Sequence, residues 1–181
     1  MLINNNLAEK IFGVPLSDRQ LKDLNSCLER FSINTFPRMT HFISQCAYES
    51  NGLRYLQERG EGYYYEMRED LGNTVVGDGK RFRGAGAIKI KGRLMFQAFA
   101  EYIKDRQIIN GVSVPSFYVE TNYPFTSSGF WWESNQMNEY VDQGATCRQV
   151  STKINGFDPA DGLIDRLAYY EITRRVLRKN D

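Results

Sequence analysis

Two glutamates, Glu49 and Glu58, lie nine residues apart in surroundings of different polarity. Glu49 follows Phe42 by seven residues and Cys46 by three, which places it on the apolar face of an expected helix, in the last turn. Burial and the negative end of the helix dipole both disfavour a carboxylate, so we expect a raised pKa at Glu49. A general acid needs this property, because it must keep its proton near neutral pH. The same spacing also fits an ordinary glutamate at the edge of the apolar face, pointing to water.

Glu58 lies in a hydrophilic, glycine-bearing segment, where we expect a carboxylate to remain ionised. A protonated and an ionised carboxyl group in contrasting environments form an acid–base pair. An inverting glycosidase holds such a pair about 6.5–9.5 Å apart, which leaves room for a water molecule. Spacing alone leaves several nearby carboxylates as competitors for the second role, namely Glu61, Glu66, Glu69 and Asp70.

Helix signals surround these two residues. Ser17 and Gln20 form a capping-box pattern, and Pro37 lies near the start of the helix that carries Glu49, which Asn51-Gly52 would end. Further helices are expected over 96–103, after a cap at Ser127-Ser128, after a cap at Thr146, and from Leu163 to about Arg178.

The segment from Leu71 to Gly92 differs from the rest of the chain in its residue pattern. Six glycines interrupt its short runs, and residues 87–91 alternate between apolar and basic. This pattern favours tight turns with a small β-element, on which Lys89 and Lys91 would share one face. Helices around one small glycine-rich β-region indicate an α+β, mainly helical fold with a cleft between two lobes, as a single domain over residues 1–181.

The composition excludes several classes of protein. A net charge of +1 gives no reason to expect nucleic acid, whose recognition usually requires a basic domain or stripe. No segment approaches the roughly 18 consecutive apolar residues of a membrane span. We expect Cys27, Cys46 and Cys147 to be buried thiols in a reducing environment. A single histidine, His41, excludes a multi-histidine metal site, so we expect no metal centre of that kind. The N-terminus lacks the pattern of a signal peptide.

Several ordered blocks of the sequence resemble glycoside hydrolase family 19, most closely its phage-endolysin and bacterial chitinase-like branch. The resemblance covers about residues 37–170. The blocks that carry it are Phe42 to Ser50, Leu71 to Asn73, Gly77 to Gly79, Arg81 to Ile88, Gly92-Arg93, Ser128 to Trp132, Val150 to Gly156 and Asp165-Arg166.

This resemblance implies a lysozyme-like fold that cleaves β-1,4 glycosidic bonds with inversion and without a cofactor. Peptidoglycan, or chitin as in relatives, would be the substrate. Glu49 ends the F-x-x-Q-x-x-x-E block and matches the family's general acid. Glu58 stands near the position of the partner carboxylate in endolysin relatives. Asn155 matches a substrate-contacting asparagine, and Arg166 belongs to a structural Asp-Arg pair.

The chain departs from the family pattern at four positions. Tyr48 replaces a histidine, Lys89 a sugar-contacting glutamine, Lys91 the Ser/Thr that positions the attacking water, and Met95 an asparagine. An ammonium ~4 Å from a carboxylate attracts it by about 4 kcal/mol at an effective dielectric constant near 20, or roughly three pKa units. Such a shift would impair Glu49 as an acid and suit Glu58 as a base. Alternatively, both lysines are solvated.

Two hypotheses follow. The first is an active muramidase or endolysin with Glu49 and Glu58 as acid and base, and with Tyr48, Lys89, Lys91 and Asn155 as glycan contacts. The second is a phage-particle module that binds peptidoglycan, or serves as structure, with turnover attenuated. We expect a monomer unless the chain is built into a particle. It would stay in the host cytoplasm until released to the cell wall, or be virion-associated.

Overall fold

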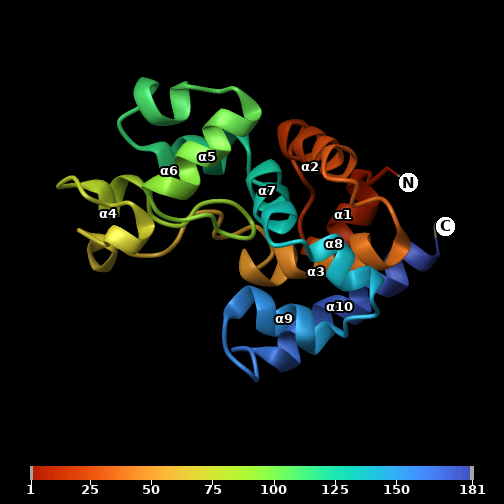
Figure 1. Ribbon diagram of the computed structural model, residues 1–181. Helices are drawn as coiled ribbons and strands as arrows, with labels where there is room; N and C mark the ends of the chain where they lie inside the picture. The colour runs from red at the N-terminus through yellow and green to blue at the C-terminus, as the bar shows by residue number, and fades with distance from the viewer. Residues whose placement is uncertain (1, 180–181) are drawn as a thin grey trace.

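The computed structural model is described here for residues 2–179 and is mainly helical (Figure 1). Its α-helices are α1 (Asn5–Phe12), α2 (Asp18–Arg30), α3 (Phe36–Glu49), α4 (Asp78–Arg81), α5 (Arg93–Ile103), α6 (Pro115–Asn122), α7 (Thr126–Ser134), α8 (Met137–Asp142), α9 (Cys147–Asn155) and α10 (Leu163–Arg178). Short helical turns of other types span Tyr63–Tyr65, Glu69–Leu71 and Gln107–Gly111. None of the helices within residues 2–179 is both long and apolar enough to cross a membrane.

The predicted β-element between Leu71 and Gly92 is wrong. Across residues 2–179 the only β-pairing consists of isolated bridges, in which Ala85 pairs with Gln57 and with Ile90. Ala85 and Ile90 exchange N–H···O bonds of 3.0 and 2.9 Å around a tight turn that contains Lys89. Gly86, at φ +101°, bends this turn, and left-handed glycines elsewhere in the segment interrupt any extended run. Lys89 and Lys91 therefore do not share the face of a strand.

The predicted helix starts with local side-chain caps are confirmed. Ser17 and Thr146 each close a capping box with a glutamine three residues later, at α2 and α9. Pro37 lies in the first turn of α3, which ends at Glu49. These signals are enough to predict where a helix begins, because the capping residue and its helix are adjacent in sequence.

The predicted cap at Ser127-Ser128 is wrong, because both serines lie inside α7. The buried carboxylate of Asp23, from α2, accepts hydrogen bonds from the backbone N–H groups of Phe125 (2.7 Å) and Thr126 (3.1 Å) instead. Ser128 Oγ accepts from the N–H of Ile88 at 2.8 Å and so fixes the glycine-rich turn. A distant acid has taken the role that a local serine was expected to have.

Helix α3 lies at the centre of the core. Every residue from Met39 to Ala47 is buried, and Phe42 meets Trp132 edge to face at 5.4 Å between ring centroids. In Figure 1, α4, α5 and α6 gather in one group, whereas α3 lies with α9 and α10 in the other half of the molecule. The three cysteines are free and buried, as predicted. This packing fixes the end of α3, where Glu49 lies.

Candidate active site

Glu49 is held by a buried arginine from α10. Its Oε1 accepts a hydrogen bond from Nη2 of Arg166 at 2.6 Å, and Nη1 of the same guanidinium donates to Gln45 Oε1 at 2.7 Å. The Arg166 side chain is 2% exposed, whereas that of Glu49 is 23% exposed. Gln45 and Glu49 are one helical turn apart on the same face of α3, so one guanidinium reaches both.

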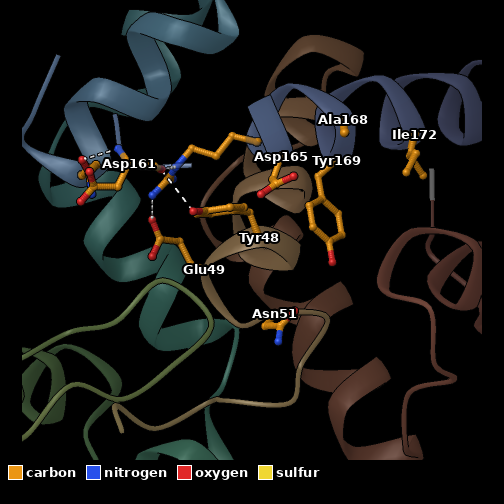
Figure 2. Close-up of a pocket in the computed structure, with 10 residues that line it drawn as sticks. Tyr48, Glu49, Asn51, Asp161, Asp165, Ala168, Tyr169 and Ile172 are labelled. Atoms are coloured by element: carbon orange, nitrogen blue, oxygen red, sulfur yellow. Dashed lines mark hydrogen bonds and ion pairs between the residues drawn. The ribbon is translucent and has the colours of Figure 1, made fainter. Parts of the chain in front are cut away.

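Position 45 carries glutamine, a neutral acceptor, so Glu49 is the one carboxylate paired with Arg166 within residues 2–179. The guanidinium also lies 4.0 Å from the centroid of the Tyr48 ring, and its Nε donates to the backbone oxygen of Asp161 at 2.9 Å. Figure 2 shows Tyr48 and Glu49 pointing toward the segment around Asp161. The expectation for Glu49 weighed burial and the helix dipole and left this cation out.

Glu58 lies on the loop before the turn Tyr63–Tyr65 and is half-buried. Its Oε1 accepts from the hydroxyl of Tyr65 at 2.9 Å, and its Oε2 accepts from the backbone N–H of Gly84 at 3.2 Å. Burial, followed by the hydrogen bond to Glu58, raises the pKa of Tyr65 far above its usual range. Burial and a hydrogen bond to Glu58 also raise the pKa of Tyr64. Neutral donors therefore hold Glu58.

Lys89 connects the surroundings of the two glutamates. Its Nζ donates to the backbone oxygen of Glu49 at 2.6 Å. Burial lowers the pKa of Lys89, while the charges of Glu49 and Glu58 both act to raise it, so the ammonium interacts with both carboxylates. A Cβ built on Gly84 would lie 2.8 Å from Glu58 Oε2 and 3.2 Å from Lys89 Cβ, which shows how closely Lys89 and Glu58 approach.

Lys91 and Met95 lie apart from this contact. Lys91 is exposed, with its Nζ 5.7 Å from the centroid of the Tyr65 ring. Met95 is half-buried and packs against the hydrophobic core. Of the two lysines, Lys89 is therefore the one that reaches the end of α3.

A cavity of about 690 Å³ opens on the α10 side of Glu49. Of the predicted site residues, Tyr48, Glu49 and Asn155 line it, together with Asp161, Asp165 and Arg166 (Figure 2). Asn155 Oδ1 accepts from the N–H of Asp161 at 3.0 Å, and Tyr48 donates to the Asp161 carbonyl at 3.2 Å. Glu58 and the two lysines do not line this cavity.

Three of the competing carboxylates have other partners. Glu61 forms an ion pair with Lys80 at 2.8 Å, and Asp70 forms one with Arg68. Glu66 accepts from the N–H groups of Gly77 and Gly79. Glu69 is exposed. Among residues 2–179 no group of three or more His, Cys, Asp or Glu side chains is placed to hold a metal ion.

Sequence reasoning missed two partners of the glutamates. The resemblance gives Arg166 a structural role within an Asp-Arg pair, but this arginine binds Glu49, which lies 117 residues away. In the sequence, Tyr65 is only one of three consecutive tyrosines. An acidic residue seven positions before a tyrosine is a weak signal, because the intervening loop decides whether the two side chains meet.

Two solved structures share the fold. Chitinase C from Streptomyces griseus HUT6037 matches with a TM-score of 0.77 at 16% identity, covering 98% of this chain and 77% of that chain. A glutamate-to-glutamine variant of chitinase C matches with a TM-score of 0.72 at 14% identity, covering 98% and 93%. No family model matches the sequence. At this identity the likeness shows the fold alone: the chain has the lysozyme-like fold of chitinase C, which confirms the fold that the resemblance implied.

Proposed function

We propose that the protein is a glycoside hydrolase that cleaves β-1,4 bonds of peptidoglycan with inversion. The observation that supports this most is the link between two carboxylates from separate elements. Lys89 is bonded to the backbone of Glu49, and its charge interacts with both Glu49 and Glu58, in a chain that has the fold of a chitinase. Fold alone assigns no activity, so the proposal depends on this pairing.

Glu49 is proposed to protonate the glycosidic oxygen, and Glu58 to take a proton from water on the opposite face of the sugar. In the free protein Glu49 is paired with Arg166 at 2.6 Å. Arg166 is thereby placed to stabilise the Glu49 carboxylate that forms when the proton passes to the leaving oxygen. The Lys89 side chain spans the gap between the two elements. The proposed mechanism requires the two carboxyls to stand roughly 6.5–9.5 Å apart, as in inverting enzymes.

Charge supports peptidoglycan over chitin as the substrate. Lys89 and Lys91 lie near Glu58 or its tyrosine partner, and cations there attract the lactyl and peptide carboxylates that chitin lacks. Tyr48 and Asn155 line the cavity on the other side of Glu49 and are proposed to contact the glycan. A role in host lysis, as an endolysin or on a virion, belongs to the same proposal.

The test is clearing of purified peptidoglycan by Glu49→Gln. General acid catalysis contributes about 10²–10⁴-fold, so we expect a loss of that size with the fold intact by circular dichroism. The matched control is Glu29→Gln, an exposed glutamate in the last turn of α2, which should lyse like the wild type. Equal lysis by Glu49→Gln would refute the assignment of Glu49 as the acid.

A second candidate is a module that binds peptidoglycan without turnover. Lys89 favours it, because its half-buried ammonium is bonded to the backbone at the end of α3 and its charge acts on both Glu49 and Glu58. A peptidoglycan pull-down beside the turbidity assay separates the two functions. Wild-type binding without lysis favours the module, and prompt wild-type lysis removes it.

A further inference from the structure

The carboxylate of Glu58 accepts a hydrogen bond on each oxygen, and the Tyr64 hydroxyl is a further donor to it. The Tyr65 hydroxyl bonds Oε1 at 2.9 Å, and the Gly84 N–H bonds Oε2 at 3.2 Å. The backbone of Glu58 is held as well, because its own N–H donates to the Gly84 carbonyl at 2.8 Å. The two oxygens together offer about four lone pairs, so three donors still leave acceptor capacity for a water molecule.

Tyr65 is itself fixed by the fold. It is 7% exposed, whereas its neighbours Tyr63 and Tyr64 are 72% and 58% exposed. The buried side chain of Asn73 donates to the Tyr65 carbonyl at 2.9 Å and accepts from the N–H of Arg93 at 2.9 Å. The phenol is therefore presented to Glu58 by a chain of hydrogen bonds that begins at the first residue of α5.

From this geometry we propose that Tyr65 is a positioning residue that orients the Glu58 carboxylate and keeps it ionised. The inference deepens the proposed function and rests on it for the role of Glu58 as a base. A hydrogen bond donated to a carboxylate favours the charged form, and a fixed direction aims the free lone pairs at the attacking water.

Other groups face Glu58 and must be held constant in any test. They are the Tyr64 hydroxyl, the Lys89 ammonium and, beyond Tyr64, the Arg83 guanidinium. The Tyr65 phenol stays a donor at ordinary pH, because burial and the charge of Glu58 raise its pKa. A change in pH dependence on removal of this one hydroxyl can then be assigned to the bond with Glu58.

The experiment compares Tyr65→Phe with Tyr63→Phe in the full chain. Peptidoglycan lysis is followed from about pH 4 to about pH 9, and the carboxyl ¹³C resonance of Glu58, identified by its loss in Glu58→Gln, is titrated by NMR. A hydrogen bond to a charged group is expected to move the acid limb of activity to higher pH by about one to two units in Tyr65→Phe, with KM unchanged. Tyr63→Phe should overlay the wild type in both measurements.

The two readouts separate the inference from the proposed function. A Glu58 resonance that titrates at higher pH in Tyr65→Phe than in Tyr63→Phe supports the inference even if the wild type cleaves no wall. A resonance that titrates alike in both variants overturns it, as do coincident activity profiles in an active protein. Wild-type lysis that is unchanged in Glu58→Gln overturns the proposed base and, with it, the catalytic part of the inference.

Discussion

The surroundings of Glu49 and of Glu58 differ in the kind of group that holds each carboxylate. Glu49 is paired with the guanidinium of Arg166, between helices α3 and α10. Glu58 is held by tyrosine hydroxyls of the turn Tyr63–Tyr65 and by the backbone N–H of Gly84. Both glutamates are half-buried, so exposure does not distinguish them. The two carboxylates therefore differ in the chemistry of their partners, a cation for Glu49 and neutral donors for Glu58. They do not differ in how far each is exposed to solvent.

The largest expected loss in the free energy of unfolding comes from removing Arg166, the ionic partner of Glu49. Arg166→Met removes the buried partner of Glu49 and leaves that carboxylate and Gln45 without it. Removing one member of a buried pair costs about 3–5 kcal/mol, which urea unfolding near neutral pH should show. Arg174→Met is the control, since its exposed pair with Glu171 should contribute less than about 1 kcal/mol. A loss for Arg166→Met no greater than that of the control would contradict the difference between the two sites.

Low pH should destabilise the contact between α3 and α10, beside Glu49, by protonating His41. His41 lies on α3 and packs against Tyr170 of α10, with 4.7 Å between ring centroids. Burial lowers the pKa of His41 from 6.5 to about 4. The unfolded state therefore binds the proton first, and stability present above pH 6.5 falls by about 3 kcal/mol as pH drops toward 4. Denaturant unfolding at about pH 7 and about pH 4.5 measures this loss.

The matched variant is His41→Phe, which cannot titrate. The buried carboxyl of Asp23, whose pKa is raised by burial, acts in the opposite direction, but it is the same in both proteins. The variant should lose less stability between the two pH values than the wild type. Equal losses would show that His41 does not set the acid sensitivity of the α3–α10 contact.

The Glu58 side can be disturbed sterically by Gly84→Ala. The backbone of Gly84 does not require glycine, but an added Cβ would lie 2.8 Å from Glu58 Oε2. Displacing this oxygen should cost about 1–3 kcal/mol of stability and lower lysis at least about tenfold, because a misplaced base loses the attacking water. Lysis rates and thermal midpoints check the two effects. Full lysis by this variant would show that the observed position of Glu58 is not needed.

The smallest expected effect is that of Lys89→Gln, which keeps a donor for the Glu49 carbonyl and removes the charge. Loss of an attraction of about 1 kcal/mol in water should lower the preference for peptidoglycan over chitin roughly fivefold, and less at high salt. Initial rates on both polymers measure the ratio. A large gain in lysis would instead favour the module with attenuated turnover.

The sequence was sufficient to predict the structure where the contact that determines it joins residues close together in the chain. The capping boxes at Ser17 and Thr146 lie within four residues of their glutamine partners, and both helices begin as predicted. The position of Glu49 at the end of α3 follows from the same periodicity. The fold class was partly predicted, since the helical part is confirmed and the β-region is reduced to isolated bridges.

The charges around the candidate site could not be predicted in the same way. Arg166 meets Glu49 only because α10 packs along α3, and Asp23 replaces the predicted serine cap of α7 from about a hundred residues away. The contact of Tyr65 with Glu58 depends on how the intervening loop closes, with Gly62 at φ +76° before the tyrosine turn. Periodicity and spacing do not encode such contacts.

Product stereochemistry tests most directly whether Glu49 and Glu58 act from opposite faces of one glycosidic bond. Proton NMR of peptidoglycan fragments in the first minutes of digestion records the anomer released before mutarotation. Inversion of a β-1,4 bond predicts that the α-anomer appears first. A β-anomer that appears first, or the absence of any new reducing end, would contradict the proposed acid–base pair.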